Sequence, residues 1–200
     1  GNPRTLNLSL SGFDWRFRTF LAIMVVFTLG NSSDAFLMLK AQKAGLDIVQ
    51  IFLMLAMWKA VTSALSIPAG ILSDRIGRNR VIRAGWLVYA LVYLGFGLAT
   101  QTWQVWALYA LYGVYYAMTD GVASALVADL VPQAEKRGTA FGLYNAAVGV
   151  SALPASLIAG LLWQHINPSA PFFFGSALAF IAMVALTALM RASSHTSATA

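Results

Sequence analysis

The chain contains no cysteine and few charged residues, and these two absences set the first limits on what it can be. Without cysteine it has no disulfide, no thiol nucleophile and no thiolate ligand for a metal. Charged residues make up 10% of its 200 residues, whereas a soluble domain carries about 25%. Hydrophobic residues make up 59%. A water-soluble fold of this length cannot bury so much apolar surface, so the composition predicts an integral membrane protein.

The chain also lacks the short motifs that identify common enzymes and ATP-driven pumps. It contains no His-Glu-x-x-His, no Gly-x-Ser-x-Gly and no Gly-rich phosphate loop. We therefore expect neither an enzyme, nor a metal site, nor a cofactor. The net charge of +6 does not indicate a nucleic-acid partner, because the basic residues lie between apolar stretches, where they report membrane topology.

Six apolar stretches are long enough to cross a bilayer, since about 20 apolar residues suffice. The first is interrupted by the polar segment 30–34, which is a poor helix former and predicts a kink or an unwound turn. The chain is therefore expected to be an all-α membrane protein. The predicted spans are approximately 17–39, 48–72, 81–99, 105–128, 139–163 and 172–190.

The distribution of lysine and arginine predicts the orientation of these spans. When the connections alternate between two sides, ten basic residues fall on one side and two, Lys40 and Lys43, on the other. The positive-inside bias places the richer side in the cytoplasm. Both ends and the loops 73–80 and 129–137 are then cytoplasmic, with 40–47, 100–104 and 164–171 outside, in a plasma or inner membrane. The ten residues are Arg4, Arg16, Arg18, Arg75, Arg78, Arg80, Arg83, Lys136, Arg137 and Arg191.

Three segments follow from this reading. Residues 1–15 form a polar cytoplasmic leader or the end of a central linker, 16–191 the membrane domain, and 192–200 a disordered cytoplasmic tail. Because the chain begins with Gly1 and shows no signal-peptide character, we expect it to be part of a longer protein.

The segment 70–83 is the most distinctive stretch of the chain. It reads Gly-Ile-Leu-Ser-Asp-Arg-Ile-Gly-Arg-Asn-Arg-Val-Ile-Arg, with Asp74 as its one acid among four arginines. Gly70 and Gly77 are expected at turn positions, because a tight reversal between two membrane helices needs the backbone freedom of glycine. The residues expected to carry the function of this loop are Gly70, Asp74, Arg75, Gly77, Arg78 and Arg80.

This pattern, Gly-x-Leu-x-Asp-Arg-x-Gly-Arg-x-Arg, resembles the cytoplasmic loop motif of the major facilitator superfamily of secondary transporters. The segment 129–142, with Asp129-x-x-Pro132 and Arg137-Gly138-Thr139-Ala-Phe-Gly142, is similar to a second cytoplasmic loop of that family. The resemblance implies one six-helix half, the C-terminal one, of a twelve-helix fold in which each half contains two inverted three-helix repeats. It also implies alternating access against an N-terminal six-helix half, with the motif stabilising one access state.

Away from the ends of the predicted spans, three charged side chains lie in the membrane: Asp34, Lys59 and Asp120. A charge in hydrocarbon costs about 2.5–3.5 kcal/mol on insertion scales, so each needs an explanation. By rise per residue, Lys59 lies between the two aspartates in depth, roughly 8–10 Å from each. The polar residues that share helical faces with these three complete the candidate pathway for substrate or protons, with Asn145 as the best candidate on the fifth span. The whole set is Asn31, Asp34, Lys59, Ser63, Tyr112, Tyr116, Asp120 and Asn145.

Two interpretations of these charges stay open. Lys59 and one aspartate could form a buried ion pair that only fastens two helices, or the group could line a water-filled cavity that binds substrate or a proton. The second is favoured, because intramembrane charges mark transport pathways. Asp120 is preferred as the proton carrier, because Asp34 lies in a stretch expected to be unwound and hydrated. Tyr112 and Tyr116 could stack on a substrate or simply pack.

The first, second, fourth and fifth spans are expected to line the cavity, with the third and sixth outside them as supports. Pro68, Gly149 and Pro154 interrupt regular helix geometry and are candidate hinges. The sequence thus predicts secondary transport of a small molecule, with the proton as the candidate coupling ion. The alternative from another class is a membrane scaffold that transports nothing, since half a transporter cannot alternate alone.

Overall fold

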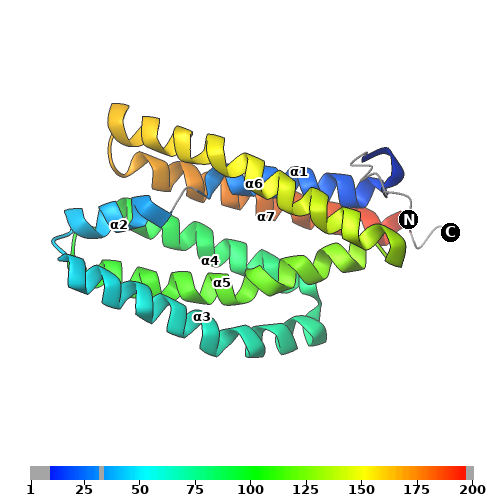
Figure 1. Ribbon diagram of the computed structural model, residues 1–200, viewed down its shortest axis with the longest axis horizontal. Helices are drawn as coiled ribbons and strands as arrows, with labels where there is room; N and C mark the ends of the chain where they lie inside the picture. Colours follow the sequence, from blue (N-terminus) through cyan, green and yellow to red (C-terminus); the bar gives the residue numbers. More distant parts are fainter. Residues whose placement is uncertain (1–9, 32–33, 197–200) are drawn as a thin grey trace, which may run out of the picture.

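The computed structural model of the chain describes residues 10–31 and 34–196, and all their regular structure is helical. This confirms the all-α class. A short 3-10 helix, η1, precedes seven α-helices within the described residues (Figure 1). Their bounds are η1 Leu10–Gly12, α1 Trp15–Gly30, α2 Asp34–Lys43, α3 Ile48–Ile76, α4 Arg78–Leu98, α5 Thr102–Leu130, α6 Ala134–His165 and α7 Ala170–Thr196.

Five helical segments of the described chain are long and apolar enough to cross a membrane, which confirms a multi-pass membrane protein. Helix α5 is not among them, because Asp120 and several tyrosines in its middle lower its mean hydropathy. A sixth crossing at α5 and the inverted repeats therefore stay predictions. The five segments are Trp15–Lys43, Ile48–Ile76, Arg78–Leu98, Ala134–His165 and Ala170–Ala192.

The predicted interruption of the first span is confirmed. Helix α1 ends at Gly30, and α2 begins at Asp34 after a break whose residues 32–33 lie outside the described part of the chain. Asn31 closes α1, and its backbone N–H donates to the carbonyls of Phe27 and Thr28 at 3.0 Å. The polar residues at this break therefore lie partway along a crossing, where irregular backbone is tolerated only inside protein or beside water.

The expectation of a loop at 73–80 is wrong. Helix α3 continues to Ile76 and α4 begins at Arg78, so one residue, Gly77, lies between them. Its φ of 98° is a conformation that residues with a Cβ adopt only under strain. Gly70, expected at a turn, lies inside α3. The segment is helical because arginine, leucine and isoleucine are compatible with a helix, and a single glycine is enough for the reversal.

The helices pack as a bundle in which α4 and α7 contact each other, α1 contacts α7 and α6, and α5 contacts α4 and α3. Helices α3 and α5 approach very closely: a Cβ added to Gly113 would lie 2.9 Å from Val61. The core between the helices is rich in fully buried aromatic rings, which include Trp86, Tyr89, Tyr93, Tyr109 and Tyr112.

Helices α3 and α6 form the two opposite edges of the bundle and are the least covered (Figure 1). Large apolar side chains on them are open, with Ile67 74% exposed on α3 and Leu153 78% exposed on α6. The start of α1, the end of α7 and the α3–α4 and α5–α6 junctions lie at one end of the bundle in Figure 1. Helix α7 continues past Arg191 to Thr196, so the expected tail begins as helix, and residues 197–200 lie outside the described chain.

Candidate functional site

The break between α1 and α2 is fastened to the core by two tyrosines. The Tyr112 hydroxyl on α5 donates to Asp34 Oδ1 at 2.8 Å. The Tyr89 hydroxyl on α4 lies 3.1 Å from the Gly30 carbonyl and 3.3 Å from Asn31 Oδ1. Because both tyrosine rings are fully buried, the two predicted polar residues Asn31 and Asp34 are oriented by rigid neighbours.

Lys59 lies over aromatic rings instead of against a carboxylate. Its Nζ is 4.1 Å from the centre of the Trp58 ring and 6.0 Å from that of Tyr116. Within the described part of the chain, Lys59 forms no ion pair with Asp34 or Asp120 within 4.0 Å. The geometry thus lacks the buried ion pair that would only fasten two helices.

Asp120, on α5, lies where two cavities meet. The first cavity, of about 200 Å³, opens between α1, α5 and α6 and has Trp86 of α4 in its wall. The second, of about 520 Å³, lies between α3 and α5. Asp120 lines both, and its side chain is exposed. Polar groups in the first cavity are Thr28, Asn31, Tyr115, Tyr116, Thr119, Asp120 and Tyr144.

The second cavity connects Asp120 with the arginine-rich segment. Ser66, Gly70 and Asp74 of α3 line it, as does Arg78 of α4. No atom lies within 4 Å of a Cβ added at Gly70 or at Gly121 on the opposite helix, so both glycines keep this space open. The second cavity therefore extends from the α3–α4 junction to Asp120.

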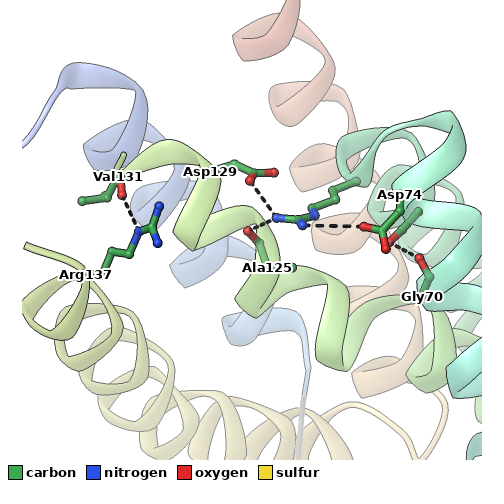
Figure 2. A network of polar contacts seen from close by, with 8 residues as sticks. Gly70, Asp74, Ala125, Asp129, Val131 and Arg137 are labelled. Atoms are coloured by element: carbon green, nitrogen blue, oxygen red, sulfur yellow. Dashed lines mark hydrogen bonds and ion pairs between the residues drawn. The ribbon is translucent and has the colours of Figure 1, made fainter. Parts of the chain in front are cut away.

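Arg78 links the α3–α4 junction to the end of α5. One guanidinium nitrogen donates to Asp129 Oδ1 and to the Ala125 carbonyl, both at 2.7 Å, and the other lies 3.6 Å from Asp74 Oδ1. Figure 2 shows Asp74, Asp129 and the Ala125 carbonyl converging on this group. Nearby, Arg137 donates to the Val131 carbonyl at 3.2 Å and so holds the connection between α5 and α6.

The other predicted residues are placed on the bundle surface. Arg75 and Arg80 are exposed at the α3–α4 junction. Ser63 on α3 and Asn145 on α6 are exposed and line neither of the two cavities described above. The candidate hinges are also exposed, and α3 and α6 run through Pro68, Gly149 and Pro154 without ending.

Several residues of the site were missed by sequence reasoning. Tyr144, one position before Asn145, is the polar side chain that α6 contributes to the first cavity, and Trp86 shows that α4 forms part of the wall as well as supporting it. Asp129 was recognised as part of a loop but not as the partner of Arg78. Trp58 could have been found because it adjoins Lys59 in the sequence.

The arrangement suits the binding of solutes or protons better than covalent chemistry. The described residues contain no group of three or more histidine, cysteine or acidic side chains that could hold a metal ion. The first cavity is lined by the Asp120 carboxylate, phenol and hydroxyl groups and apolar rings, and the second also by Asp74 and Arg78. These groups can hydrogen-bond, stack and exchange a proton.

Comparison with known proteins identifies the relatives of the chain. The family profile described as Major Facilitator Superfamily matches residues 14–200. An uncharacterized MFS-type transporter of Methanocaldococcus jannaschii is 37% identical over 90% of this chain and 46% of its own length. Multidrug resistance protein 2 of Bacillus subtilis is 32% identical over 67% of this chain and 33% of its own length. The tetracenomycin C resistance and export protein of Streptomyces glaucescens is 29% identical over 60% and 22%. The chain spans less than half the length of each of these relatives.

Proposed function

The chain belongs to the Major Facilitator Superfamily, a family of membrane transporters and not of enzymes, and from this premise we propose that it is one six-helix half of a secondary transporter. The complete protein would contain a second half, and the resemblance of the loop motifs favours the C-terminal position for this one. The proposal is supported by the length of the archaeal relative, of which the chain covers 46%.

The observation that carries the proposal is the uncovered face between the two edge helices. Helices α3 and α6 bury little of their apolar surface, and α5, which carries Asp120, shares one cavity with α6 and the other with α3. A membrane bundle that exposes polar groups in this way needs water or protein against them. A second bundle packed on α3 and α6 would enclose these cavities as a central pathway.

Alternating access follows if the two bundles rock against each other. Arg78 joins α3, α4 and α5 at one end of the bundle, so these helices would move as a unit. Pro68, Gly149 and Pro154 lie on the two edge helices, where bending would open or close the pathway. The second cavity at the Arg78 end would then become the cytoplasmic mouth.

Proton coupling is assigned to Asp120. Its carboxylate lines both cavities and forms no ion pair within 4.0 Å in the described part of the chain, so it is accessible to water and not held by a cation. Asp34, by contrast, accepts a hydrogen bond from the buried Tyr112. A carboxyl group that meets water from either side suits reversible protonation better than one fixed in the core.

The substrate is proposed to be a small organic molecule that is moved outward. Two relatives are named for tetracenomycin C resistance and export and for multidrug resistance. The aromatic lining of the first cavity, which includes Phe27, Trp86 and Tyr115, supports a ligand with apolar rings.

The proposal is tested by transport in proteoliposomes that contain the complete protein, with a panel of small organic drugs that includes tetracenomycin C. Wild type is expected to accumulate at least one compound when a proton gradient is imposed. Asp120→Asn is expected to abolish accumulation and to retain exchange, since exchange needs no net proton movement. Glu135→Gln, an exposed neutralisation at the start of α6, is the control and should accumulate normally.

Two results would contradict these assignments. Absence of both accumulation and exchange in the wild type, for every compound of the panel, would count against small-molecule transport of this class. Accumulation by Asp120→Asn at the wild-type level would remove Asp120 as the proton carrier and leave the transport proposal intact.

A further inference from the structure

We propose that Trp58 and Tyr116 form a binding site for a lipophilic organic cation, and that the Lys59 ammonium occupies this site as an internal competitor until the ligand displaces it. The inference deepens the proposed function, since it names the chemical class of the substrate. It concerns binding, however, and can be tested without transport.

The first observation is an aromatic cluster on two helices. Trp58 on α3 lies 5.1 Å from Tyr116 and 5.5 Å from Tyr112 on α5, measured between ring centres, and the two tyrosines lie 5.1 Å apart. The Trp58 and Tyr116 rings meet nearly edge to face, at 65°. One cation, the Lys59 ammonium, lies over both rings, so their π surfaces can be reached from a single position.

The second observation is that this point already holds a cation. Lys59 Nζ lies 4.1 Å from the Trp58 ring centre and 6.0 Å from that of Tyr116, both within the range of cation–π attraction. The Trp58 side chain is only 6% exposed, whereas Lys59 is exposed. The lysine is therefore the removable part of the arrangement, because its flexible stem can swing away without repacking the core.

The third observation is the nearby negative charge. Tyr112, whose ring belongs to the cluster, donates a hydrogen bond to Asp34 Oδ1 at 2.8 Å, so a carboxylate lies beside the rings. A cationic ligand on the rings would gain from the same carboxylate. The displaced ammonium would keep water and Asp34 as alternative partners, since no carboxylate of the described chain holds it in an ion pair within 4.0 Å.

The charge of the ligand follows from this competition. A cation must displace Lys59 to reach the rings, so its affinity is reduced by the fraction of time that the ammonium spends there. An anion would instead pair with Lys59 and would lose a partner when the lysine is removed. Loss of Lys59 should therefore raise the affinity for a cation and lower the affinity for an anion.

The test is equilibrium dialysis of tetraphenylphosphonium and of the equally shaped anion tetraphenylborate against the complete protein in detergent micelles, with protein-free micelles as the blank. Lys59→Met is expected to tighten tetraphenylphosphonium binding by about three- to thirtyfold, the range of a cation–π contact. It should not tighten tetraphenylborate. Lys59→Arg, which keeps a cation for the rings, should bind like wild type.

Two further variants separate displacement from simple loss of positive charge. Lys43→Met removes a lysine that lies 5.4 Å over a different ring, that of Trp163, and should leave the affinity unchanged. Tyr116→Leu in the Lys59→Met background should cancel the gain, because one π surface is lost. The proposal is overturned if Lys59→Met leaves tetraphenylphosphonium affinity unchanged or weaker, if Lys43→Met gives the same gain, or if the gain survives Tyr116→Leu. None of these outcomes bears on whether the complete protein transports.

Discussion

The polar side chains inside the bundle differ in how firmly they are held. Asp34 accepts a hydrogen bond from the buried Tyr112, whereas Asp120 is exposed between two cavities and Lys59 rests on aromatic rings. The two aspartates, equivalent in composition, therefore have different tasks. Asp34 holds the break between α1 and α2 against the core, and Asp120 is the group that we propose to exchange a proton.

Tyr112→Phe is expected to destabilise the bundle by about 1–3 kcal/mol, because a hydrogen bond to a charged group is lost while the ring packing is kept. The measurement is reversible unfolding in mixed detergent micelles. Tyr109→Phe is the matched control: this ring is equally buried on the same helix, and its hydroxyl has no hydrogen-bond partner in the described part of the chain. Its removal should be neutral or slightly stabilising. Equal losses in the two variants would show that the contact with Asp34 contributes nothing specific.

Among the helices, the junction of α3 and α4 shows how a charged motif can be helical and still link two helices to a third. Gly77 reverses the chain, and Arg78, the first residue of α4, reaches the last turns of α5. Asp74 lies farther from Arg78 than Asp129 does, at 3.6 Å against 2.7 Å, and its side chain is 69% exposed. Asp129 therefore carries most of the structural link, and the exposed Asp74 would be available for contacts with the proposed second bundle.

Asp74→Asn in the complete protein is accordingly expected to leave expression and thermal stability nearly unchanged, since an exposed ion pair contributes about 0–1 kcal/mol. It should lower transport by shifting the balance between access states. Asp129→Asn is the comparison variant and should reduce thermal stability more, because the shorter contact is weakened. Unchanged flux in Asp74→Asn would show that the arginine-rich motif sets only the membrane topology and not the balance between access states.

Hydropathy was sufficient to locate the helices, because apolar length is what a bilayer selects. Helix propensity placed the break at 30–34, because glycine, asparagine, serine and aspartate are poor helix formers. Hydropathy could not show that 73–80 is helical, since a cluster of arginines carries the same composition in a loop and in a helix. Nor could it pair Arg78 with Asp129, 51 positions away, because no periodicity connects residues on different helices.

On the scale of the whole molecule, the two ends of the bundle should face opposite sides of the membrane. The α3–α4 junction and the α5–α6 connection lie at one end, and the α2–α3 and α6–α7 connections at the other (Figure 1). Single cysteines can report this without background, since the chain has none. Asn79→Cys should react with an impermeant maleimide only after the cytoplasmic side is opened, and Lys43→Cys from outside in intact cells. Labelling from outside at position 79 but not at position 43 would show that the orientation is the opposite of the predicted one.

The uncovered apolar surface of α3 and α6 makes the second bundle the central requirement of the account. The most direct measurement is exchange of a radiolabelled compound, taken from the panel on which the complete protein is active, across proteoliposomes. They would contain this chain alone, the second half alone, or both halves co-reconstituted. If transport needs both halves, we expect exchange at the protein-free rate for each half alone and recovery of exchange when the two are combined. Exchange by this chain alone at the rate of the combined halves would contradict it.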